Sequence, residues 1–136
     1  MQYVKWLDEK YSVNIQHIDN QHKKLVEIVN QAFRAKMDKS GRGSTLQILE
    51  QLDQYAKSHF LEEESLLRAH NYPALEAHQA AHANFITKVK EYTADLNSDG
   101  EALSDDILIF LKDWLLNHIM LMDKSYSTFL NNLGVY

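Results

Sequence analysis

Five histidines and two carboxylates occupy positions at which a purely structural helix would carry leucine. His59 and Glu63 are four residues apart, and so are His78 and His82, which places each pair on one face of an α-helix. Imidazole and carboxylate groups at this spacing can bind one metal ion together, as in helical zinc sites. The candidate metal ligands are His22, His59, Glu63, His78, His82, His118 and Asp123.

The alternative is that these pairs are ordinary surface residues. A surface His–Glu pair at this spacing is common, and two half-exposed histidines would explain His78 and His82. Two observations argue against it. His78 and His82 lie within an otherwise unbroken apolar stripe, and Glu62 and Glu64 can face water while Glu63 points inward. An ionised carboxylate left unpaired in an apolar interior costs several kcal/mol, so the inward groups must be satisfied by one another or by metal.

The other polar residues of interest have less specific spacing. His118 and Asp123 are five residues apart, or about 140° around an ideal helix, which is too far for a simple chelate of one ion. The spacing is sensible if the helix runs beside two ions, or if a local π-bulge tightens the turn. His17 and His70 lie off the apolar stripes, and we interpret them as solvent-facing.

The number of inward ligands predicts a dinuclear centre in which both carboxylates bridge. With about six positions on each metal, the five imidazoles, two bridging carboxylates and one bridging oxygen fill about eleven of about twelve positions. The remaining position suits a diatomic molecule. Nitrogen-rich ligation suits iron, and the chain has no cysteine for a thiolate zinc site or a cysteine-ligated iron–sulfur cluster.

This ligand set favours a carrier over an oxidising enzyme. Carboxylate-rich di-iron sites use Glu-x-x-His pairs, and this chain contains none. With fewer negatively charged carboxylate ligands, the iron ions are less able to reach a high-valent state. We therefore expect reversible dioxygen binding at a non-haem di-iron centre, without enzymatic activity. The alternative left open is a di-iron enzyme that reduces nitric oxide or peroxide at the same open position.

Apolar residues at i, i+3, i+4 and i+7 place the ligands on four helices. Asp19 and Ser104 are expected N-caps, Ser44 with Gln47 forms a capping-box pattern, and Pro73 suits a first helical turn. The chain is expected to form an all-α, antiparallel up-down-up-down four-helix bundle with an N-terminal extended arm, in a single domain. The predicted ranges are 1–17 for the arm and about 19–37, 44–68, 73–96 and 104–132 for the helices, within a domain of residues 1–136.

Composition limits the partners of this domain. The net charge is −5 and no dense Lys/Arg cluster is present, so nucleic acid and membrane surfaces are not expected partners. No segment is apolar enough to span a bilayer, and the N-terminal residues lack a secretory apolar region. We therefore expect a cytoplasmic protein.

Several segments together resemble bacterial hemerythrin, and the resemblance covers nearly the whole chain. The matching motifs are Ile18-Asp19-x-Gln21-His22, His59-Phe60-x-x-Glu63-Glu64, Tyr72-Pro73, His78-x-x-x-His82 and His118-Ile119-x-x-x-Asp123-x-x-Tyr126. They occur in the order and at the spacings of the hemerythrin family. Asn14 stands where family members often have glycine.

The resemblance implies a division of the ligands between two iron ions joined by a bridging oxo or hydroxo group. One iron would be bound by His78, His82 and His118, the other by His22 and His59, and Glu63 and Asp123 would bridge both. Dioxygen would bind at the iron with two histidines. The role of the protein would be oxygen storage, oxygen delivery to an oxygen-requiring enzyme, or oxygen sensing.

The same resemblance makes Leu115 a candidate wall of the oxygen pocket, where its bulk would limit water entry. Trp114 is a second candidate for this wall. Phe60 and Tyr126 are expected to pack in the core.

Overall fold

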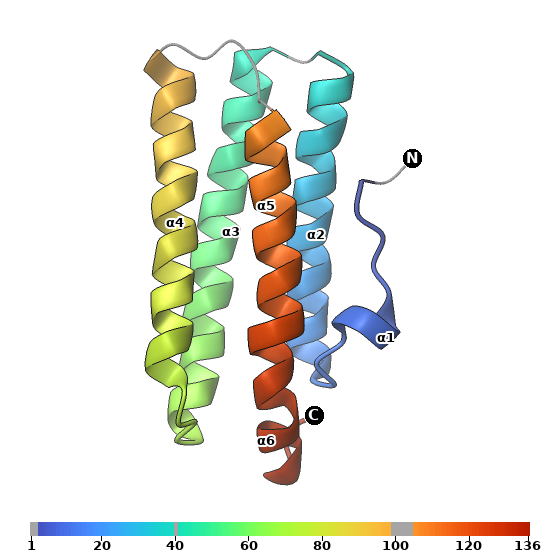
Figure 1. The fold of residues 1–136 in the computed structure, drawn as a ribbon, viewed down its shortest axis with the longest axis vertical. Helices are drawn as coiled ribbons and strands as arrows, with labels where there is room; N and C mark the ends of the chain where they lie inside the picture. The colour runs from blue at the N-terminus through green and yellow to red at the C-terminus, as the bar shows by residue number, and fades with distance from the viewer. Residues whose placement is uncertain (1–2, 40, 99–104) are drawn as a thin grey trace.

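Apolar residues at helical spacing form four long antiparallel helical segments in the computed structural model (Figure 1). The structure describes residues 3–39, 41–98 and 105–136. The first three segments are α2 (Gln16–Met37), α3 (Arg42–Ala69) and α4 (Leu75–Ser98). The fourth consists of α5 (Asp105–His118), a π-helical turn η1 (Ile119–Asp123) and α6 (Lys124–Asn132). The chain reverses direction between successive segments, which confirms the predicted helical bundle.

Two of the predicted helix starts are wrong because other groups begin the helices. Asp19 is not an N-cap, since α2 begins at Gln16 and Ile15 precedes it. The capping-box pattern at Ser44 does not start α3 either, because the helix begins at Arg42 after Gly41. Pro73 lies in a turn before α4, whose first residue is Leu75. The predicted cap Ser104 lies outside the described residues.

The N-terminal arm lies against the bundle and contains one short helix, α1 (Asp8–Tyr11) (Figure 1). Near its beginning the arm is attached to α2 by two hydrogen bonds. The Val4 N–H donates to Asn30 Oδ1 at 2.8 Å, and Asn30 Nδ2 donates to the Val4 carbonyl at 2.9 Å. Asn14 has a φ of 57°, a left-handed conformation that asparagine tolerates better than most residues, so this position accepts either asparagine or glycine.

The carboxylate of Asp19 joins the arm to α2. It accepts hydrogen bonds from Ser12 Oγ at 2.5 Å and from the Val13 N–H at 2.8 Å. Hydrogen bonds to a charged group contribute about 1.5–3 kcal/mol. We therefore expect Asp19→Ala to lower the free energy of unfolding by about 2 kcal/mol in chemical denaturation, while Asn20→Ala at the exposed neighbouring position has little effect. Equal losses in the two variants would contradict this role of Asp19.

The apolar core has two parts, and the candidate ligands lie near the boundary between them. The larger cluster includes Leu25, Phe60 and Phe85, and the smaller one includes Ile18 and Leu67. Close-packed side chains therefore enclose the polar centre on both sides along the bundle axis. This packing holds the ligand side chains in place.

Candidate metal centre

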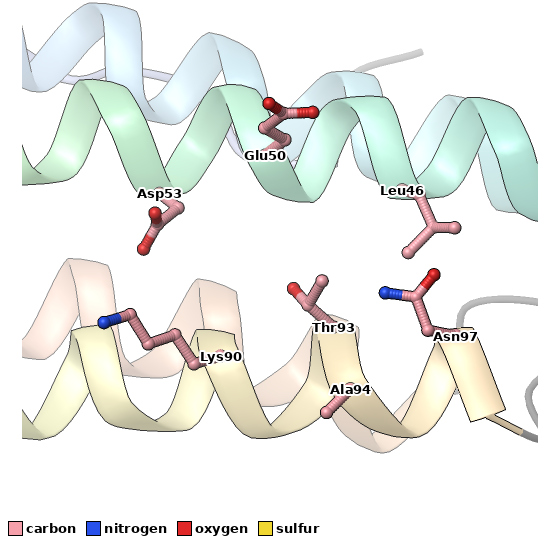
Figure 2. Close-up of a pocket in the computed structure, with 7 residues that line it drawn as sticks. All are labelled: Leu46, Glu50, Asp53, Lys90, Thr93, Ala94 and Asn97. Atoms are coloured by element: carbon pink, nitrogen blue, oxygen red, sulfur yellow. The ribbon is translucent and has the colours of Figure 1, made fainter.

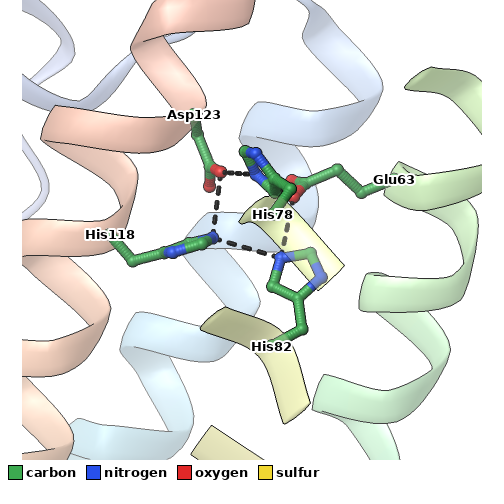
Figure 3. Close-up of side chains that lie close together, drawn as sticks. All are labelled: Glu63, His78, His82, His118 and Asp123. Atoms are coloured by element: carbon green, nitrogen blue, oxygen red, sulfur yellow. Dashed lines mark hydrogen bonds and ion pairs between the residues drawn. The ribbon is translucent and has the colours of Figure 1, made fainter. Parts of the chain in front are cut away.

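The seven candidate ligands converge in the interior of the bundle, and all of them are buried. Within each of two groups, the ligand atoms lie no more than 4.8 Å apart. One group is Glu63, His78, His82, His118 and Asp123, and the other is His22, His59 and Glu63. Figure 3 shows the first group, with its side chains directed toward one another from three neighbouring segments.

Glu63 contacts both groups of histidines through different oxygen atoms. Its Oε1 lies 2.9 Å from His78 Nε2 and 3.0 Å from His82 Nε2. Its Oε2 lies 3.3 Å from His59 Nε2 and 3.6 Å from His22 Nε2. A carboxylate whose two oxygens face separate nitrogen sets has the arrangement of a bridge between two cations.

Asp123 divides its oxygens in the same way. Oδ1 lies 2.7 Å from His78 Nε2 and 3.1 Å from His118 Nε2, whereas Oδ2 lies 3.0 Å from His22 Nε2. Two carboxylates therefore separate a set of three histidines from a set of two. This division is the same as the one that the family resemblance implies.

The π-helical turn η1 explains how His118 and Asp123 reach the same centre. A π-turn adds a residue to the helical repeat, so residues five apart lie near one face. The buried face shifts accordingly: Met122, four residues after His118, is only half-buried, whereas Asp123 is fully buried. Of the two explanations considered for this spacing, the structure thus contains the local π-bulge.

Several buried polar atoms of the centre form no hydrogen bond of good geometry, although some of them lie as close together as the 3.0 Å between His22 Nε2 and Asp123 Oδ2. They are both ring nitrogens of His22, Oε1 of Glu63 and Oδ2 of Asp123. His82 Nε2 and His118 Nε2 also face each other at 3.1 Å, although each carries a lone pair in its neutral, metal-binding form. Imidazole nitrogens and carboxylate oxygens that converge without well-formed hydrogen bonds fit bound cations, so the residues present match the donor set that iron takes.

The electrostatics of the centre favour positive charge among its carboxylates. Burial alone would lower the pKa of His22 and of His78, but the nearby carboxylates of Asp123 and Glu63 outweigh it and raise each pKa to about 9. Burial would raise the pKa of Glu63, yet the surrounding histidines hold it well below its ordinary value. Burial and the charge of Glu63 would raise the pKa of Asp123, which the histidines lower instead.

The sequence model of the family described as "Hemerythrin HHE cation binding domain" matches residues 13–130. The chain belongs to the hemerythrin family. All seven candidate ligands lie within the matched residues. Membership of the hemerythrin family supports oxygen binding at a metal site, and together with the His/Glu/Asp cluster it supports iron binding.

Individual hemerythrins match over most of their length. The bacteriohemerythrin of Pseudomonas aeruginosa is 36% identical over 93% of this chain and 80% of its own. That of Clostridium acetobutylicum is 32% identical over 89% of this chain and 96% of its own. A solved wild-type hemerythrin has a TM-score of 0.84 at 26% identity, covering 93% of this chain and 96% of its own. These relatives are named as hemerythrins, in agreement with the family that the sequence motifs predict.

Aromatic rings cover the sides of two candidate ligands in this hemerythrin domain. Phe60 stacks on His82 with ring centroids 3.8 Å apart, and Trp114 stacks on His118 at 4.5 Å. Leu115 is buried, with 4% of its surface exposed. Packing of this kind fixes the ring planes and excludes water from the centre.

Three polar residues contact the ligands from outside, and sequence reasoning gave none of them this role. His59 Nδ1 donates to Gln21 Oε1 at 2.6 Å, and the Tyr126 hydroxyl donates to Glu63 Oε2 at 2.9 Å. The expectation that Glu64 faces water is wrong, because its carboxylate accepts a hydrogen bond from His82 Nδ1 at 2.7 Å. All three lie in the motifs that carry the family resemblance, which was the available signal.

The two remaining histidines lie away from the centre. The His17 side chain is 72% exposed, as expected, and its Nε2 lies 3.4 Å from Glu62 Oε2. His70 was expected to face solvent, but it is half-buried. Its Nδ1 donates a hydrogen bond to the Leu66 carbonyl at 2.9 Å.

A groove of about 510 Å³ between α3 and α4 lies apart from the metal centre (Figure 2). None of its lining residues is a candidate ligand. They are Leu46, Glu50, Asp53, Lys90, Thr93, Ala94 and Asn97. Within the part of the chain that the structure describes, no helix has the length and apolar content needed to cross a bilayer.

Proposed function

We propose that this hemerythrin-family chain binds dioxygen reversibly at a non-haem di-iron centre, within one cytoplasmic domain. The observation that carries the proposal is the division of the oxygens of Glu63 and Asp123 between two separate sets of histidines. One iron would be held by His78, His82 and His118. The other would be held by His22 and His59, with both carboxylates and an oxo or hydroxo group as bridges.

Iron, when bound, supplies the reducing electrons and the open coordination position that dioxygen requires. The chain supplies a rigid, buried donor set with more imidazole than carboxylate. Oxygen storage, delivery to an oxygen-requiring enzyme, or sensing would each use this property.

Water exclusion is the role we assign to Leu115 and Trp114. The two residues are adjacent in α5, and the Trp114 ring covers one face of the His118 ring. Truncating Leu115 would leave a cavity in the packing of α5, and a cavity that has polar groups near it can admit water. We expect Leu115→Ala to shorten the lifetime of the oxygenated protein by about tenfold, corresponding to about 1.4 kcal/mol, in a time course of its visible spectrum. Leu130→Ala, in the smaller core cluster, is the control and should leave that lifetime unchanged.

Metal content and turnover together test the proposed function. Protein reconstituted with ferrous iron without oxygen and then desalted should retain two iron ions per chain. Steady-state assays with nitric oxide or peroxide and an electron donor should show no sustained consumption. One iron per chain would contradict the dinuclear centre, and sustained turnover would contradict the assignment as a carrier.

A further inference from the structure

The outer nitrogens of two candidate ligands contact acceptors of different charge. His82 Nδ1 lies 2.7 Å from a carboxylate oxygen of Glu64, whose side chain is 16% exposed. His59 Nδ1 lies 2.6 Å from the amide oxygen of Gln21. His82 belongs to the set of three histidines and His59 to the set of two, so the difference coincides with the division of the centre.

The neighbours of Gln21 fix the orientation of its amide. Gln21 Nε2 donates to Glu62 Oε2, and this nitrogen also lies 3.3 Å from His17 Nε2. With the amino group held outward, the amide oxygen faces His59 and accepts its Nδ1 proton. The Nε2 lone pair of His59 is then directed toward Glu63 and the centre.

The charge of the acceptor changes how strongly an imidazole donates to a metal. A carboxylate that accepts the outer N–H increases the basicity of the inner nitrogen, and a charge-assisted hydrogen bond is stronger than one to a neutral amide. His82 is therefore a stronger donor than His59. Lys57 and Glu64 line a second groove, distinct from that of Figure 2, and Lys57 forms an ion pair with Asp53 at 2.9 Å.

Tyr126 adds to this difference from the other side. Its hydroxyl donates to Glu63 Oε2, the oxygen that faces His22 and His59, and not to Oε1. A donated hydrogen bond withdraws electron density from the oxygen that accepts it, so Oε2 is the weaker donor of the two. The set of two histidines is thus paired with the poorer carboxylate oxygen.

We infer that Glu64 and Gln21 are positioning residues that make the two metal positions unequal, so that the three-histidine position binds its ion first and more tightly. The inference rests on the dinuclear centre of the proposed function. Losing an outer partner of a ligand histidine typically costs 10–100-fold in metal affinity. For the loss of Glu64, this decrease in metal affinity should affect only the three-histidine position.

The test is anaerobic calorimetric titration of metal-free protein with ferrous iron. Wild type should bind two ions in two resolved steps. Glu64→Gln should weaken the tighter step by about 10–100-fold and leave the weaker step within about threefold. Glu50→Gln is the matched control, because it makes the same change at an exposed position of α3, where the carboxylate accepts a hydrogen bond from Gln54. Thermal unfolding of the metal-free variants checks that each one folds.

The outcomes separate this inference from the proposed function. Two ions bound with equal affinity by wild type, or an unchanged tighter step in Glu64→Gln, would overturn the inference and leave the dinuclear centre intact. A single ion bound by wild type would overturn the dinuclear centre itself. Glu64→Asp, which keeps the charge, should recover at least part of the lost affinity, and its failure to do so would also count against the inference.

Discussion

Replacing Glu63 with alanine is expected to reduce the iron retained by reconstituted protein from two ions per chain to one or none. Glu63 is the only residue present in both groups of ligand atoms among the described residues, and it faces four histidines. Its removal takes one donor from each position and half of the negative charge that the two carboxylates supply. Iron content after desalting measures the effect.

Two further variants make the Glu63 experiment specific. Glu63→Gln retains the shape and the contact with Tyr126 but not the charge, so it should also lose iron while it folds normally. Glu50→Ala removes a carboxylate at an exposed position of the same helix, where it accepts a hydrogen bond from Gln54 and touches no candidate ligand. It should retain two ions. Full iron occupancy in Glu63→Gln would contradict the bridging role.

Removing the metal is expected to lower the melting temperature by on the order of 10 °C. A ligand present at about a thousand times its dissociation constant stabilises the folded state by about 4 kcal/mol, and each kcal/mol shifts the melting temperature by several degrees in a domain of this size. The metal-free centre also retains buried polar atoms without well-formed hydrogen bonds on His22, Glu63 and Asp123. Differential scanning calorimetry with and without a chelator measures the shift.

The Glu63→Ala variant provides the control for metal removal. Because it should hold one ion or none, chelator should lower its melting temperature less than it lowers that of wild type. If chelator lowered the melting temperature of wild type and of this variant equally, the effect would not come from the metal centre. An unchanged melting temperature in metal-depleted wild type would contradict the stabilising role of the metal.

The helices and the convergence of the ligands were predictable because both depend on spacing. Residues four apart share a helix face, so His59 and Glu63, and likewise His78 and His82, had to lie together once the helices formed. The five-residue step from His118 to Asp123 was informative in the opposite sense. It conflicted with a simple chelate on an ideal helix and left two explanations open, two ions beside one helix or a local π-bulge, and the structure contains the π-bulge η1.

The helix starts and the outer contacts were not predictable in this way. Asp19 has the residue type of an N-cap, but its carboxylate is used by the arm, a contact between segments that local sequence does not encode. Glu64 lies beside an inward residue on α3, and its periodicity indicates exposure. It turns to His82 because α4 packs next to it, which only the assembled bundle determines.

The central claim, reversible dioxygen binding, is tested most directly by one cycle of the visible spectrum of iron-loaded protein. The protein is reduced without oxygen, exposed to air, and then returned to argon. We predict an absorption band that appears with oxygen, disappears under argon and returns on a second exposure. Rapid conversion to an oxidised spectrum that argon does not reverse would contradict the claim.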